Sequence, residues 1–174
     1  MTEGDIQNIL SRHLIDKGHS FVIPNVVSMF YSEADLVSVT NSRYLHEYEI
    51  KVDYHDFKRE IEAVNGDSQS WAKNSKHKHI KARLNGKSQS NYYKVGPAKY
   101  WLVVPVGVVD VDEIPEHWGL YEIDEDYEYP DDPVVKSSKP KFIHKDKIDH
   151  GIARSLGTNL TKRYWSELEA NNEQ

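Results

Sequence analysis

The sequence predicts an α/β (α+β) domain with a central mixed β-sheet flanked by helices. Alternating or continuous apolar runs bounded by turn residues predict the strands, and apolar residues at helical spacing predict the helices. The expected order is a helix, three strands, a helix, two strands and terminal helices, which is typical of helices packed on a mixed sheet. A length of 174 residues fits a single domain, 1–174.

Local signals define the N-terminal elements. Thr2 and Asp5 form the pattern of a capping box, and Gly18 is placed to end the helix that follows. The segment 19–27 alternates loosely and predicts a strand, in which Pro24 indicates an edge position or a bulge. One face of the helix carries Ile6, Ile9, Leu10, His13 and Leu14.

The segment 33–60 is the part of the chain around which the rest is organised. Two β-patterned runs, 35–40 and 44–52, flank a Thr-Asn-Ser-Arg segment and predict an antiparallel hairpin. If its turn is centred on Ser42, pairing places one strand's acid opposite the other's, with Cβ atoms roughly 5 Å apart. The facing acids are Asp35 and Glu49, and Lys51 follows one pleat further along the same face.

Two carboxylates so close repel each other and need a cation. Because the sequence contains no cysteine, disulfides, thiolate zinc sites and thiol catalysis are excluded. Oxygen ligands without thiolate suit a hard divalent ion such as Mg²⁺, which takes one or two carboxylates and keeps several waters.

The pattern of Asp35, then Glu49-Ile50-Lys51, then Asp56-Phe57 opening a helix resembles the active-site signature of the PD-(D/E)XK nuclease superfamily. The resemblance is to its small phage-encoded and DNA-repair members, and it implies a restriction-endonuclease-like fold with an αβββαβ core. Ala34 stands where the family name has proline.

The resemblance implies a role for each residue of the signature. Asp35 and Glu49 would ligate Mg²⁺, or Mn²⁺ as its substitute, together with the main-chain carbonyl of Ile50. Lys51 would orient the attacking water or stabilise charge in the transition state. A first-helix acid sometimes joins this site, so Glu3 is a further candidate ligand; the alternative is an acid favoured by the helix dipole.

The remaining elements follow in order. A helix led by Asp53 or His55 should end at Asn65-Gly66, and continuous apolar runs predict strands at 100–104 and 118–123. After an acidic loop at 124–132, helical spacing predicts one helix ending at Gly157 and a second, capped by Thr158.

Charge is distributed unevenly along the chain. The formal net charge is −6, yet residues 68–100 hold eight Lys and Arg and no acid, whereas residues 110–132 hold eleven acids and no Lys or Arg. The basic segment is predicted to be a loop or a short helix around 75–84, and it is either a solvated face or a surface that tracks phosphates. The candidate DNA-binding residues are Lys73, Lys76, His77, Lys78, Lys81 and Arg83, and Trp71, Tyr92 and Tyr93 could stack on bases.

The function expected from these features is Mg²⁺-dependent hydrolysis of DNA phosphodiester bonds, most simply by an endonuclease. Two alternatives remain open: a non-catalytic nucleic-acid-binding accessory protein on the same scaffold, or a protein-interaction domain using the acidic loop. RNA is a lesser possibility as substrate, and paired duplex cuts would require a homodimer. No run approaches a membrane span and no targeting pattern opens the chain, so no membrane partner and a cytoplasmic location are expected.

Overall fold

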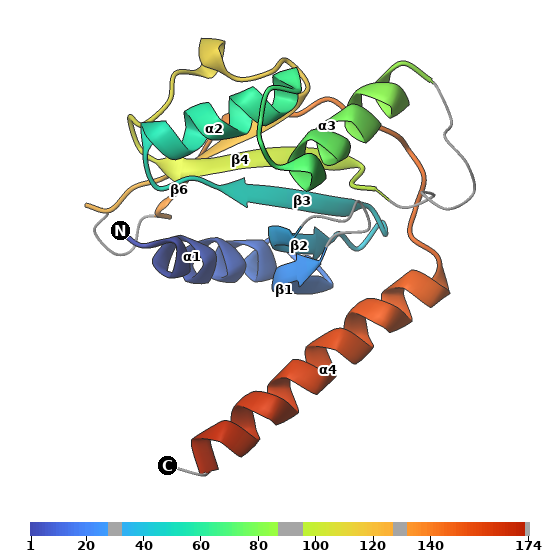
Figure 1. Ribbon diagram of the computed structural model, residues 1–174. Helices are drawn as coiled ribbons and strands as arrows, with labels where there is room; N and C mark the ends of the chain where they lie inside the picture. The colour runs from blue at the N-terminus through green and yellow to red at the C-terminus, as the bar shows by residue number, and fades with distance from the viewer. Residues whose placement is uncertain (28–32, 87–95, 127–131, 173–174) are drawn as a thin grey trace.

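A computed structural model of the protein describes residues 1–27, 33–86, 96–126 and 132–172. The strands and helices lie in three layers (Figure 1). The strands are β1 (Phe21–Val27), β2 (Glu33–Val39), β3 (Leu45–Ile50), β4 (Lys99–Pro105), β5 (Trp118–Ile123) and β6 (Val134–Ser138). The helices are α1 (Glu3–Asp16), α2 (Tyr54–Asn65), α3 (Trp71–Leu84) and α4 (His150–Asn172), with a 3₁₀ turn at Val111–Glu113.

The strands form one mixed sheet in the order β1-β2-β3-β4-β5-β6. The β1–β2, β2–β3 and β5–β6 pairs are antiparallel, while β4 is parallel to both β3 and β5. Parallel pairing of β3 with β4 requires a crossover, which α2 and α3 provide. The predicted α/β class, with a central mixed sheet flanked by helices, is confirmed.

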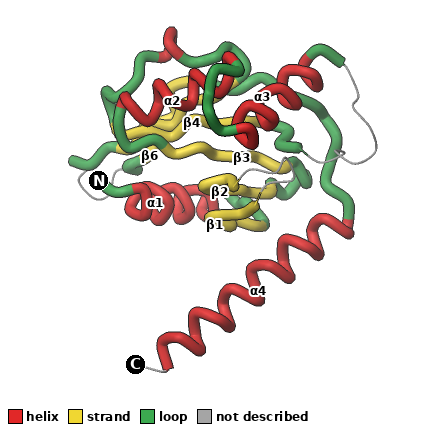
Figure 2. Tube along the Cα trace, in the orientation of Figure 1, coloured by secondary structure: helices red, strands yellow, loops and turns green. Residues whose placement is uncertain are grey.

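Helices cover both faces of the sheet (Figures 1 and 2). On one face, Ile6, Leu10 and Leu14 of α1 pack against residues of β2 to β6 that include Tyr48 and Trp101. On the other face, α2 and α3 pack over β4 and β5. Because β3 lies between β2 and β4 and under helices on both faces, all six of its residues are buried.

The local signals read from the sequence are borne out at the first two helices. Thr2 and Asp5 make the capping box of α1. Asp53 caps α2, and Gly66 ends it in the left-handed conformation with φ 89°. Pro24 lies in β1, which is an edge strand as expected.

Three elements differ from the prediction. The basic segment forms a full helix, α3, which begins at Trp71 because Ser70 caps it. Strand β6 was not predicted, since its short run follows directly on the acidic loop. The two predicted C-terminal helices are a single helix, α4, because one Gly inside a helix costs only about 1 kcal/mol.

Helix α4 packs only partly on the domain. Its first turns contribute Leu156 to a small core with β1 and β2, and further along Arg163 donates to the Pro24 carbonyl of β1. The C-terminal end of the helix lies away from the sheet (Figure 1). None of the helices in the described part of the chain is both long and apolar enough to cross a membrane.

Candidate functional site

The β2–β3 hairpin has the register that the sequence predicted. Leu36 pairs with Tyr48 and Val37 with Glu47, so the same register carried one residue further sets Asp35 opposite Glu49. The carboxylate of Asp35 accepts a hydrogen bond of 2.7 Å from the Ile50 main-chain N–H. This bond fixes Asp35 beside the end of β3.

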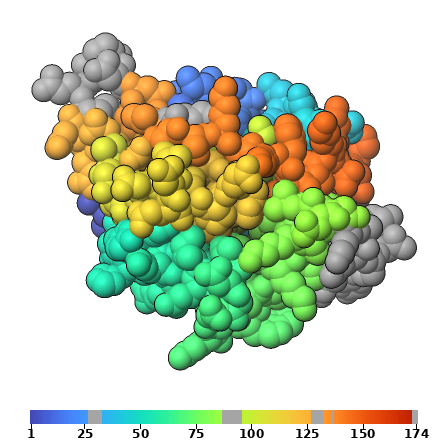
Figure 3. Space-filling model, turned by 90° about the horizontal axis from the view of Figure 1, so that it is seen from above, coloured from blue at the N-terminus to red at the C-terminus, as the bar shows by residue number. Residues whose placement is uncertain are grey.

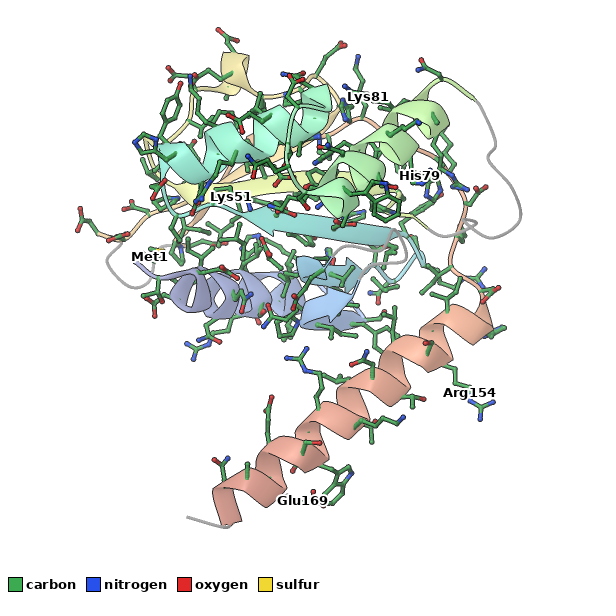
Figure 4. All side chains as sticks on the ribbon, in the orientation of Figure 1. Met1, Lys51, His79, Lys81, Arg154 and Glu169 are labelled. Atoms are coloured by element: carbon green, nitrogen blue, oxygen red, sulfur yellow. The ribbon has the colours of Figure 1, made fainter. Side chains whose placement is uncertain are left out.

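Lys51 lies between the two facing carboxylates, at the end of β3 and below α2 (Figure 4). Its Nζ donates to Glu49 Oε1 at 2.8 Å and lies 3.9 Å from Asp35 Oδ2. The ammonium therefore occupies the place where two acids need a cation. The structure brings the three predicted catalytic residues together.

Two helices add charged groups that the sequence pattern did not reveal. From α2, Glu60 points to the same place, with its Oε2 3.9 Å from Lys51 Nζ. From α3, Lys76 Nζ lies 2.7 Å from Glu49 Oε2 and 3.3 Å from Glu47 Oε1. We call the whole group the carboxylate–lysine cluster, which consists of Asp35, Glu47, Glu49, Lys51, Glu60, Lys73 and Lys76.

The cluster is closed at its centre and open at one edge. Glu47, Glu49, Glu60 and Lys76 are buried. Solvent reaches the side chains of Asp35 (20% exposed), Lys51 (10%) and Lys73 (37%). A ligand can thus approach the cluster from the side where Asp35, Lys51 and Lys73 lie.

The cluster holds four carboxylates against three ammonium groups, which leaves one negative charge in excess when all are ionised. Burial raises the pKa of Asp35 to about 7, and repulsion from Glu49 adds to the rise. Burial likewise raises the pKa of Glu47 to about 6. Asp35 and Glu47 are thus the two acids of the cluster whose ionisation is disfavoured.

The other two acids stay ionised. Burial opposes the charge of Glu49, but the ammonium groups of Lys76, Lys51 and Lys73 outweigh it and lower the pKa of this carboxyl. Burial also opposes the charge of Glu60, whose pKa is held well below its usual range, most strongly by the hydrogen bond with His77. His77 Nε2 lies 2.6 Å from Glu60 Oε1, and burial lowers the pKa of this imidazole.

Two of the expected DNA-binding residues lie elsewhere than predicted. Lys76 and His77 are on the buried face of α3, where the acids of the cluster hold them, so neither lies at the surface. Lys73 is half-exposed and bonds Glu60 at 2.9 Å. The remaining three are on the outside of α3: Lys78 and Lys81 are exposed, and Arg83 pairs with Asp146. Tyr92, Tyr93 and most of the acidic loop lie outside the described residues.

The donors near the open edge fit a hard divalent cation in kind, since they are carboxylate oxygens. An ion between Asp35 and Glu49 would displace the Lys51 ammonium from that position. The resemblance implies that the main-chain carbonyl of Ile50 is a metal ligand, whereas the Ile50 group in contact with Asp35 is the N–H. Among residues 1–27, 33–86, 96–126 and 132–172, no cluster of three or more His, Asp or Glu side chains has the arrangement of a preformed metal site.

Glu3 approaches this edge from α1. Its carboxylate accepts a hydrogen bond from Gln7, whose amide also donates to the main-chain oxygen of Asp35 at 3.1 Å. Glu3 also adds slightly to the rise in the pKa of Asp35. It is therefore near the site, and its role as a ligand stays a prediction.

Comparison with known proteins adds a fold relationship. The SPO1766 protein of unknown function from Silicibacter pomeroyi superposes with a TM-score of 0.59 over 98% of this chain and 91% of that one, at 13% sequence identity. At this identity the similarity is one of fold. No family model and no curated protein matches the sequence.

The pH dependence of stability tests the environment of Asp35. Because the pKa of Asp35 is about 7 in the folded chain and 3.8 for an unperturbed aspartate, the folded chain binds more protons between these values, and its free energy of unfolding falls as pH rises through that window. Asp35→Asn removes this loss and keeps an acceptor for the Ile50 N–H. Urea unfolding should show the variant gaining about 2 to 3 kcal/mol on the native chain between pH 5 and pH 8. Glu33→Gln, an exposed acid on the same strand, serves as the control, and an equal gain in it would contradict the assignment.

Substitution of Lys76 tests the pairing at the centre of the cluster. Lys76→Met leaves Glu47 and Glu49 without their main cation in a buried site, which should cost about 3 to 5 kcal/mol of unfolding free energy. Lys78→Met, two residues along on the exposed face, should change stability by less than about 0.5 kcal/mol. Denaturant unfolding of both variants measures the difference. Similar stability of the two would show that Lys76 is not the partner of these acids.

Proposed function

We propose that the protein is a Mg²⁺-dependent DNA nuclease whose site is formed by Asp35, Glu49 and Lys51. The observation that carries the proposal is the meeting of two carboxylates from neighbouring strands, with an amine between them, at the solvent-reached edge of a buried charged cluster. A purely structural ion pair needs one acid for each base. Here an acid is in excess.

The unfavourable ionisation of Asp35 in the folded chain supports a functional role for this acid. Its raised pKa means that ionised Asp35 opposes folding near neutral pH, even though its carboxylate accepts the hydrogen bond from the Ile50 N–H. Strongly perturbed groups that solvent can reach are found preferentially at functional sites. A divalent cation would remove the penalty, because it supplies the missing positive charge.

Each residue has a distinct part in the proposed reaction. Asp35 and Glu49 would hold the metal ion, which when bound supplies an activated water and offsets charge on the phosphate. The nearby carboxylates of Glu49, Glu60 and Asp35 raise the pKa of Lys51 despite its own burial, so this amine stays protonated at neutral pH. Lys51 would thus donate hydrogen bonds to the phosphate or the water and would not act as a base.

The topology supports the resemblance to the PD-(D/E)XK nucleases. One helix, three antiparallel strands and a helical crossover lead into a strand parallel to the third. This order agrees with the αβββαβ core that the resemblance implies. Asp35 lies on the second strand, Glu49 on the third and Lys51 directly after it, which are the places that the resemblance implies for the two acids and the lysine.

A cleavage assay tests the proposed function. Duplex, branched and single-stranded DNA are incubated with Mg²⁺ or Mn²⁺ and with the native chain, Lys51→Ala or Glu49→Gln. The native chain should cut at least one substrate, and each variant should lose about 100-fold or more of the rate, because the charge stabilisation at the phosphate is gone. Glu33→Gln should cut at the native rate.

Products that persist unchanged in both variants, or that form in excess chelator, would defeat the assignment of this site. Circular dichroism of each variant shows whether a loss of rate comes with a loss of fold. Glu49→Gln keeps the size of the side chain, so it disturbs the packing of β3 less than alanine would.

A non-catalytic nucleic-acid-binding protein is the second candidate. It is favoured by one observation: Lys51 and Lys76 already contact the two carboxylate oxygens of Glu49, so this acid is fully paired without a metal. If the protein binds nucleic acid without cleaving it, the same DNA substrates should be bound and no metal-dependent products should form.

A further inference from the structure

The outer side of α3 borders a hollow that is separate from the carboxylate–lysine cluster. Its volume is about 600 Å³, within the range of ligand pockets, and it lies between the last turn of α2 and the outer face of α3. These two helices lie side by side on the surface seen in Figure 3. Its lining on α3 is formed by Trp71, Asn74, Ser75, Lys78, His79 and Lys81.

The chemistry of the lining is that of a nucleic-acid site. In a chain of net charge −6, the lining contains two lysines and a histidine and no acid. His79 and Lys81 are both on α3 (Figure 4). Lys81 donates to the Val64 carbonyl, whereas Lys78 is directed to solvent as an exposed side chain. Lys78 is thus placed to meet a phosphate at the surface.

Trp71 is the least expected member of this lining. Its side chain is 72% exposed, more than any other large apolar residue in the described part of the chain. It stands at the first position of α3, and Trp71, Asn74, Ser75 and Lys78 share one helical face. An exposed indole on a helix, with an amide, a hydroxyl and a cation on the same face, suits stacking on a nucleobase.

The position of Trp71 relates the hollow to the proposed site. Lys73, two residues on, turns inward to bond Glu60 at 2.9 Å and reaches Glu49 at 3.6 Å. One helix therefore presents an aromatic ring to solvent and a cation to the cluster within its first turn. Trp71 is therefore two residues along α3 from a cation that reaches the proposed site.

We propose that the α2–α3 hollow binds an unpaired base of single-stranded DNA by stacking on Trp71, with Lys78 contacting the adjacent phosphate. A base inside a duplex has both of its faces covered, so the site selects single strands, flaps or frayed ends. The inference rests on the proposed nuclease function and narrows its substrate class.

Binding is tested without divalent metal, so that cleavage plays no part. The four tryptophans include two buried ones, Trp101 and Trp118, and in a Trp165→Phe background Trp71 is the single exposed one. Titration with a twelve-residue oligo-dT in chelator should quench its emission to saturation. A duplex of the same length should give little quenching at matched concentration.

Anisotropy of labelled oligo-dT gives the affinities of variants. Trp71→Ala should bind about tenfold or more weakly, whereas Trp71→Phe, which keeps a ring, should restore most of the affinity. Lys78→Gln should weaken binding and reduce the slope of log affinity against log salt by about 1. The Trp165→Phe chain should bind like the native one.

Three results would overturn the inference: unchanged affinity in Trp71→Ala, equal quenching by the duplex, or tighter binding of oligo-rU than of oligo-dT. The outcome is independent of the cleavage assay. Cleavage without quenching of Trp71 would refute base binding in the hollow and leave the nuclease proposal standing. Quenching without cleavage would refute the nuclease proposal and leave base binding in the hollow standing.

Discussion

The structure depends on how the acids of β3 are neutralised. Glu47 and Glu49 lie on the central strand under α2 and α3, where an unpaired charge would cost several kcal/mol. Lys76 from α3 meets both, and Lys51 meets Glu49 from the end of the strand. The ion pairs therefore fix where α3 lies on the sheet. A helix with a mostly polar sequence is held to the core by charge as well as by apolar contact.

Neutralisation is incomplete at the edge of the cluster where Asp35 lies. Asp35 is drawn beside Glu49 by the hairpin register and by the Ile50 N–H, although its charge opposes folding near neutral pH. Solvent reaches this edge through Asp35, Lys51 and Lys73. An excess carboxylate beside an amine is what a divalent cation and a phosphate would use, and the α2–α3 hollow borders the same helix that carries Lys73.

Much of this arrangement could be predicted from the sequence, because strand alternation and the turn at Ser42 determine which residues face each other. Asp35, Glu49 and Lys51 follow from that rule. Glu60 could not be found in this way, since its place depends on how α2 packs on the sheet. A basic run such as that around Lys76 and His77 predicts an exposed surface, because Lys is mostly exposed in folded proteins, whereas the buried acids draw these two residues inward. The unbroken α4 and the short β6 show that a single Gly and a short edge run are weak local signals.

The central claim is that Asp35 and Glu49 share one site, in a cluster whose carboxylates outnumber its ammonium groups by one. Carbon-13 NMR of the Asp35 side-chain carboxyl, assigned by its loss in Asp35→Asn, measures this directly. The account predicts a titration midpoint near pH 7 without divalent ions, since the pKa is raised to about 7, and a midpoint lower by about one unit or more with Mg²⁺. A midpoint near pH 4 that Mg²⁺ does not move would contradict it.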